Sequence, residues 1–243
     1  MPWDMVRDWL STPLSGQAEH LVAPTVAWHG RLMVLSWSIL LPLGILVARF
    51  FKVTPRQKWP DQLDNTFWWR CHLYLQQAGV ALALLAAGLV LLDGPGMPDG
   101  PVATAHRLLG WLLLGLGGVQ LVGGWLRGTK GGPTVAVFAG DHFDMTRRRI
   151  LFERAHKGLG WLCMPLALIA TALGLVLADA PRWMPLVIGA WWIALIAAFL
   201  AMQRRGMCLD TYQAIWGPDP SLPGNRIAPI GWRVTRRGPG REG

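Results

Sequence analysis

The sequence predicts an all-α integral membrane bundle of five transmembrane helices, the first four of which form a core. Of the 243 residues, 52% are hydrophobic and only 15% are charged, whereas soluble domains carry about 25% charged residues. A helix needs about 20 apolar residues to cross the ~30 Å hydrocarbon core of a bilayer. Apolar segments of this length lie at 28–50, 67–92, 104–126, 153–178 and 184–202. Alternation with period two is absent, which disfavours strands.

The placement of basic residues predicts how the chain is oriented. We divide the chain into an N-terminal segment 1–26, a transmembrane domain 27–203 and a basic Pro/Gly-rich tail 204–243. All but four of the 23 Lys and Arg residues fall on the side that holds the tail. Because Lys and Arg accumulate on the cytoplasmic side, we expect a cytoplasmic tail and a periplasmic N-terminus in a bacterial inner membrane. Basic residues placed at the membrane surface explain the net charge of +9, so the charge does not require a nucleic-acid partner.

The sequence of two shorter segments leads to a separate prediction for each. Residues 4–10 are amphipathic and predict a short helix at the membrane interface. The tail from Gly217 onward is rich in Pro, Gly and Arg, which predicts either disorder or ordering by a partner protein.

Each of the first four helices places one histidine within about its first two turns. Ionisable side chains inside membrane helices are costly and mark functional sites. Because successive helices alternate in direction, the first and third histidines lie near the outer face and the second and fourth near the inner face. A haem iron takes two axial ligands from opposite sides, and flanking helices can supply them. The pattern therefore predicts two b-type haems held by His29, His72, His106 and His156.

Basic and small residues next to these histidines fit the same interpretation. Haem propionates are anionic and Arg pairs well with carboxylates, although basic residues also anchor helix ends at lipid headgroups. Glycine lets a flat macrocycle approach a helix, and it also serves ordinary helix packing. The candidate cofactor-binding residues of this kind are Arg31, Arg70, Arg107, Arg154, Lys157, Gly110 and Gly160.

Each of the four helices carries a short motif. These are His29-Gly30-Arg31-Leu32-Met33, Trp68-Trp69-Arg70-Cys71-His72, His106-(x)3-Gly110 and Phe152-Glu153-(x)2-His156-Lys157. Together they resemble the cytochrome b-561 family, in particular the domain that follows DOMON modules and its bacterial relatives. The resemblance covers roughly residues 28–202.

The resemblance implies a di-haem bundle for transmembrane electron transfer, with histidine pairs on helices one and three and on helices two and four. In eukaryotic members the donor is ascorbate at the cytoplasmic face, approached by basic residues at the end of the first core helix. Arg49 and Lys52 occupy matching positions here and are the implied reductant site.

Several functions remain open at this point, and no catalytic residue is assigned. The chain could carry electrons between unknown partners, or it could be a quinol- or ascorbate-dependent oxidoreductase that reduces a small acceptor such as ferric iron. It could also be a haem-bearing accessory subunit that docks on a larger respiratory or photosynthetic complex through the loop 127–152 and the tail. Metal transport is disfavoured because transport sites cluster at the midplane. His20 and His142 lie outside the pattern, and we expect His20 to be solvated.

Overall fold

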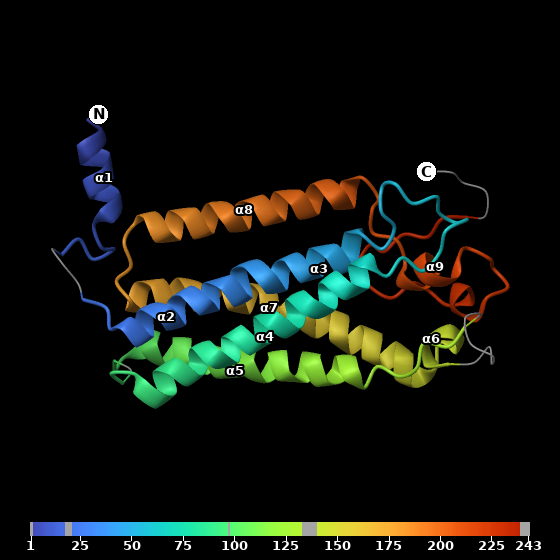
Figure 1. The fold of residues 1–243 in the computed structure, drawn as a ribbon, viewed down its shortest axis with the longest axis horizontal. Helices are drawn as coiled ribbons and strands as arrows, with labels where there is room; N and C mark the ends of the chain where they lie inside the picture. Colours follow the sequence, from blue (N-terminus) through green and yellow to red (C-terminus); the bar gives the residue numbers. More distant parts are fainter. Residues whose placement is uncertain (1, 18–20, 97, 133–139, 239–243) are drawn as a thin grey trace. The chain divides into compact units, whose positions relative to one another are not determined.

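The computed structural model describes residues 2–17, 21–96, 98–132 and 140–238, and His20 lies outside these ranges. Helices dominate the described residues (Figure 1). Five of them are long and apolar enough to cross a membrane, which confirms the predicted all-α membrane bundle. They are α2–η1–α3 (Pro24–Met33, Val34–Leu40, Leu41–Phe50), α4 (Phe67–Asp93), α5 (Pro101–Trp125), α7 (Arg147–Leu177) and α8 (Trp183–Arg204). The short elements are α1 (Trp3–Ser11), α6 (Asp141–Asp144), α9 (Thr211–Trp216) and η2 (Pro223–Arg226).

Several long helices begin earlier than the apolar pattern indicated, and the largest differences are at the first helix and at α7. The first begins at Pro24, because proline is well suited to a first helical turn, where its missing N–H costs no hydrogen bond. The fourth, α7, begins at Arg147. Its first turns are charged, and Arg149 pairs there with Glu153 one turn later at 3.0 Å. The apolar pattern of the sequence does not reveal a helix start whose first turns are polar.

The chain divides into two compact units, each of which takes segments from several long helices. Unit 1 comprises residues 1–42, 77–118 and 162–197, and unit 2 comprises residues 43–76, 119–161 and 198–243. His29 and His106 fall in unit 1, whereas His72 and His156 fall in unit 2. Each unit therefore holds one of the two predicted histidine pairs.

In unit 1, a proline shapes the first long helix. Pro42 has no N–H, so the carbonyl of Ser38 lacks the donor that an α-helix would supply. The turn before it widens into the π-helix η1, in which the N–H of Leu41 bonds to the carbonyl of Ser36. Two indoles from α8 compensate: Trp191 donates to the Ser38 carbonyl at 2.7 Å, and Trp192 donates to the Ser38 hydroxyl at 3.2 Å.

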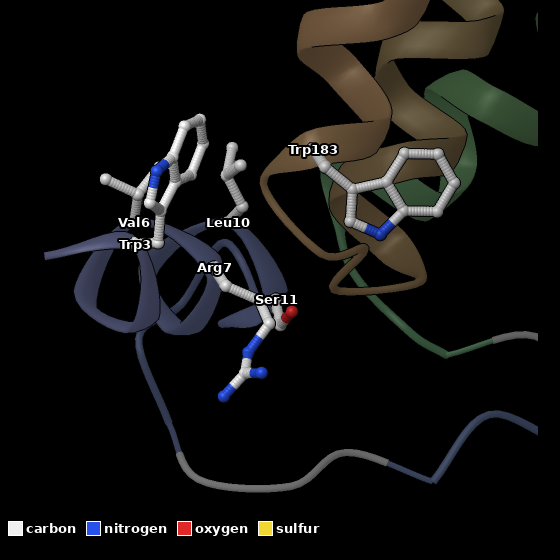
Figure 2. Close-up of a pocket in the computed structure, with 6 residues that line it drawn as sticks. All are labelled: Trp3, Val6, Arg7, Leu10, Ser11 and Trp183. Atoms are coloured by element: carbon white, nitrogen blue, oxygen red, sulfur yellow. The ribbon is translucent and has the colours of Figure 1, made fainter.

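Unit 1 also contains the amphipathic helix α1. The segment that follows α1 is fastened to the α7–α8 turn, because Ser15 donates through its N–H and its hydroxyl to Asp179 at 2.8 and 2.7 Å. Trp3, Val6 and Leu10 project from one side of α1, across a shallow hollow from Trp183 at the start of α8 (Figure 2). Trp3 is 86% exposed. The helix expected at residues 4–10 is thus present with an uncovered apolar face.

In unit 2, the described tail residues 217–238 pack against their own chain, because Arg236 pairs with Asp210 at 2.7 Å and Leu222 packs against the cluster around α9. This packing corrects the expectation of disorder or ordering by a partner. Tyr212, Ile215 and Trp216 of α9 form a buried cluster with Phe143 of α6, and α9 lies beside α6 (Figure 1). The Tyr212 hydroxyl donates to the Phe143 carbonyl at 2.9 Å. Composition misled here because Pro and Gly in this segment shape ordered turns around a few large aromatic side chains.

Candidate functional site

The two histidines of unit 1 face each other from different helices. His29 lies on α2 and His106 lies on α5. Their ring centroids are 6.3 Å apart and the ring planes meet at 75°. The first predicted pair is therefore brought together.

The two histidines of unit 2 have the same arrangement. His72 on α4 and His156 on α7 have ring centroids 6.1 Å apart and planes at 80°. Phe152 stacks on the His156 ring at 5.0 Å. Two pairs of nearly equal spacing thus arise from four helices.

Backbone carbonyls orient three of the four rings. The Nδ1 atom of His29 lies 2.9 Å from the Ala86 carbonyl, that of His106 lies 3.0 Å from Ala170, and that of His72 lies 3.1 Å from Gly44. A carbonyl only accepts hydrogen bonds, so in these contacts Nδ1 carries the hydrogen. Nε2 then keeps its lone pair and is free to bind a metal, an arrangement typical of metal-ligating histidine.

The donor set fits a haem held between two imidazoles. A metal–imidazole bond is about 2 Å long, so two imidazoles on opposite sides of one iron place their ring centroids roughly 6 Å apart. The observed separations of 6.3 and 6.1 Å match this spacing. His156 differs from the other three, because its buried Nδ1 has no hydrogen-bond partner among the described residues. Within those residues, no group of three or more His, Cys, Asp or Glu side chains gathers to hold a metal ion.

A close approach of α7 to His106 is a feature that the sequence did not indicate. A Cβ atom built on Gly174 would lie 3.0 Å from Cε1 of His106, a spacing that any larger residue would disturb. Four residues earlier on the same helix, Ala170 supplies the carbonyl that orients this ring. These residues lie far from His106 in sequence, and no local pattern marks them.

The predicted propionate partners have different surroundings. Arg31, Arg70, Arg107 and Arg154 are exposed, and Arg31 lies over the Trp28 ring at 5.1 Å. Lys157 is already engaged, because its Nζ donates to Glu153 at 2.7 Å and to the Ile230 carbonyl at 2.9 Å. A Cβ on Gly110 would meet nothing within 4 Å, whereas one on Gly160 would lie 3.2 Å from the Gln120 amide. Their assignment to propionates or to the macrocycle stays a prediction.

Next to the second pair, unit 2 encloses a buried charged group. Glu153 lies one turn before His156 and pairs with Arg149 at 3.0 Å and with Lys157 at 2.7 Å. His142 approaches the same carboxylate at 3.7 Å. Burial and the nearby Arg149 lower the pKa of His142 to about 3, so the imidazole is neutral near pH 7 and this contact is not an ion pair. His142 belongs to this cluster and to neither histidine pair.

The implied reductant residues lie at the end of α3 and are largely covered. Lys52 is 6% exposed, and its Nζ donates to the carbonyls of Leu209 at 3.0 Å and Arg49 at 3.2 Å. Burial and the nearby Lys157 lower the pKa of Lys52 to about 8. Arg49 donates to the Gln203 side chain at 2.8 Å and to the Trp232 carbonyl at 2.7 Å. The tail therefore supplies partners for both residues.

Similar proteins were found among curated sequences. No protein-family model matches the chain, and no solved structure matches it. A cytochrome b561, DM13 and DOMON domain-containing protein of Arabidopsis thaliana is 26% identical over 161 residues, 66% of this chain and 16% of that protein. A cytochrome b561 and DOMON domain-containing protein of the same plant is 26% identical over 176 residues, 71% of this chain and 38% of that protein. Ferric-chelate reductase 1 of Homo sapiens is 28% identical over 147 residues, 60% of this chain and 22% of that protein.

These relatives are all longer than the chain, which spans between 16% and 38% of their lengths. Two of the three bear the cytochrome b561 name, and the matched regions cover most of the chain. They are plant and animal proteins, so a bacterial origin stays a prediction. These matches support the resemblance to the cytochrome b561 family that the four histidine motifs indicate.

Proposed function

We propose that this protein carries electrons across a membrane through two b-type haems, one held by His29 and His106 and the other by His72 and His156. The observation that carries the proposal is the spacing of the two imidazole pairs, 6.3 and 6.1 Å between ring centroids. Similarity to proteins named cytochrome b561 supports haem b binding. Five apolar helices supply a membrane setting for both pairs.

The chain's own residues would hold and orient the cofactor. A bound haem b supplies a one-electron couple between ferric and ferrous iron. The Nε2 atoms of the paired histidines are the ligands, and the carbonyls of Ala86, Ala170 and Gly44 fix three of the rings through Nδ1. Such a hydrogen bond also makes the imidazole a stronger donor to the metal. Two histidines at each site would leave a bound haem iron no open position for oxygen, which suits electron transfer.

A count of bound haem tests this proposal directly. The measurement is a reduced-minus-oxidised visible spectrum with a pyridine haemochrome assay on the purified protein. We expect two haems per wild-type chain and at most one in His29→Ala or in His72→Ala. The matched control is His142→Asn, which removes a buried histidine that belongs to neither pair and should leave both haems in place. A folded wild-type protein without haem would refute the proposal, and so would a single haem that survives in both alanine variants.

A second candidate function concerns the electron acceptor. One relative is named ferric-chelate reductase 1, so we also propose that a ferric chelate accepts electrons from this protein on the side opposite Arg49. The test uses vesicles that enclose ascorbate and carry the protein with Arg49 facing inward. We expect added ferric citrate to be reduced outside the vesicles at a rate that falls to background in His29→Ala. Equal rates in vesicles with and without the protein would rule this acceptor out.

A further inference from the structure

The end of the tail forms a strap along unit 2, defined as residues 227–238. Arg236 anchors it, since the guanidinium pairs with Asp210 at 2.7 Å and donates to the carbonyls of Ile227 at 2.6 Å and Gly224 at 2.8 Å. Thr235 adds backbone hydrogen bonds to Cys208 at 2.8 Å and Asp210 at 2.9 Å. The strap is thus fastened at its far end to the turn between α8 and α9.

Carbonyl groups of the strap and of this turn bind three cationic side chains. The Trp232 carbonyl accepts from Arg49 at 2.7 Å, and the Ile230 carbonyl accepts from Lys157 at 2.9 Å. The Leu209 carbonyl, in the turn to which Thr235 is paired, accepts from Lys52 at 3.0 Å. The cations come from the end of α3, the residues that follow it, and α7.

Fewer carboxylates than cationic side chains lie in this region. Glu153 pairs with Lys157 but also with Arg149, and Asp210 pairs with Arg236. Among the described residues, the hydrogen-bond acceptors of Arg49 and Lys52 are neutral oxygens, namely backbone carbonyls and the Gln203 amide oxygen. Neutral acceptors satisfy hydrogen bonds but do not cancel charge, and burial of uncompensated charge is costly. A group of cations with such partners would bind an anion if the carbonyls withdrew.

The strap also completes an aromatic enclosure around Arg49. The guanidinium lies 5.4 Å from the Trp161 ring, 5.2 Å from Phe199 and 5.8 Å from Trp232. Trp232 stacks on Phe199 with planes at 13° and is 54% exposed. Of these three rings, Trp232 is the one that belongs to the strap and is also the most exposed, so removal of the strap would expose Arg49 further.

We propose that the strap is an intramolecular cover over an anion-binding site formed by Arg49 and Lys157, with the buried Lys52 nearby, and that a small anionic electron donor binds Arg49 and Lys157 only when the strap carbonyls leave them. This inference rests on the proposed electron-transfer function. The strap carbonyls and the anion compete for Arg49 and Lys157, so a bound anion favours the open position of the strap and its absence favours the covered position. The covered position is the one that the structure shows.

Strap release should speed reduction by an anion and leave reduction by a neutral donor unchanged. Gly231 has φ +127°, and a Cβ there would lie 2.9 Å from Val234, so Gly231→Ala strains the strap without altering a cation. Arg236→Ala removes its anchor. The charge-matched control is Arg205→Ala, an exposed residue on the same side of the chain. In haem-loaded protein we expect ascorbate to reduce both strap variants about tenfold faster than wild type or the control, a gain equivalent to ~1.4 kcal/mol.

Each ascorbate that donates one electron becomes its radical and releases a proton as one ferric haem becomes ferrous. Duroquinol, an uncharged donor, should reduce all four proteins at the same rate. Adding Arg49→Gln to Gly231→Ala should abolish the gain with ascorbate. A strap variant that ascorbate reduces no faster than wild type would overturn the proposal, and so would an equal gain with duroquinol.

A second readout does not depend on bound haem. Trypsin cleavage after Arg233, followed by mass spectrometry, reports how often the strap is open. We expect more cleavage in both strap variants than in Arg205→Ala. Inorganic phosphate should increase cleavage of wild type, whereas chloride at equal ionic strength should not, and Arg49→Gln should lose the phosphate effect. If the protein binds no haem, the proposed electron-transfer function fails, but the cleavage measurement still tests whether the strap covers an anion-binding site. Cleavage that does not change with phosphate would refute that proposal.

Discussion

The indole N–H of Trp191 donates a 2.7 Å hydrogen bond to the backbone carbonyl of Ser38, 153 residues earlier in the chain. That carbonyl lacks its helical donor because the residue four positions later is Pro42. A side chain of α8 therefore satisfies a backbone group that a proline in the first long helix leaves open. The bond joins two helices of unit 1 at a point where water cannot replace it in a membrane.

This relationship predicts that Trp191→Phe lowers the stability of the fold. We expect a loss of roughly 1–3 kcal/mol, the cost of a buried polar group left without its partner. Thermal unfolding of the detergent-solubilised protein measures the change. Pro42→Ala restores a backbone N–H that can serve Ser38, so the double variant should lose less than the sum of the two single variants. Strict additivity of the two losses would show that Trp191 acts by packing alone.

Gly174 predicts a selective loss of cofactor in unit 1. Gly174→Ala places a methyl group 3.0 Å from Cε1 of His106, which should rotate or displace this ligand. We expect the haem count of the purified variant to fall from two to about one, because His72 and His156 lie outside unit 1. The control is Gly189→Ala on α8, where a Cβ meets nothing within 4 Å. A full haem count in Gly174→Ala would mean that the ring adapts to the methyl group.

The burial of His142 predicts an acid-labile fold. Burial and Arg149 lower the folded-state pKa of His142 to about 3, whereas the unfolded value is about 6.5. Between these values the unfolded chain binds the extra proton, so the free energy of unfolding falls as the pH falls from about 6.5 toward 3. The slope from this group approaches 1.4 kcal/mol per pH unit.

His142→Asn removes the titrating group and should flatten this dependence. Thermal unfolding at several pH values from 4 to 8 tests it, with the wild type as reference. Other acid-sensitive groups, Glu153 among them, are present in both proteins and cancel in the comparison. Identical slopes in the two proteins would show that His142 already binds its proton in the folded state.

The uncovered apolar face of α1 predicts binding at the lipid–water interface. Trp3, Val6 and Leu10 lie on that face, and the helical spacing places Asp4 and Asp8 toward the opposite side. A peptide of residues 2–16 should gain helical circular dichroism and a blue-shifted tryptophan emission with zwitterionic phosphatidylcholine vesicles. Trp3→Asp should weaken partitioning at least about tenfold, because an apolar side chain of this size contributes several kcal/mol. Asp8→Asn on the polar side should bind at least as well as the unchanged peptide.

Much of the fold follows from the sequence because membrane helices are local structures. Each apolar segment must satisfy its own backbone hydrogen bonds in lipid, so length and hydropathy determine where the five helices lie. The histidines could be identified for the same reason, since an ionisable group in such a segment stands out. Alternation of helix direction then assigned them to two pairs, and the ring spacings of 6.3 and 6.1 Å agree with that assignment.

The remaining features were decided by tertiary structure, because they depend on contacts between residues far apart in the chain. Gly174 against His106, and Trp191 against Ser38, carry no local signal. The tail was misjudged for the same reason: its order comes from Arg236 binding Asp210 and from aromatic rings packed on α6 and α8. The sequence offered Lys52 only as a residue of the implied reductant site, and the packing of the chain buries it against the Leu209 carbonyl.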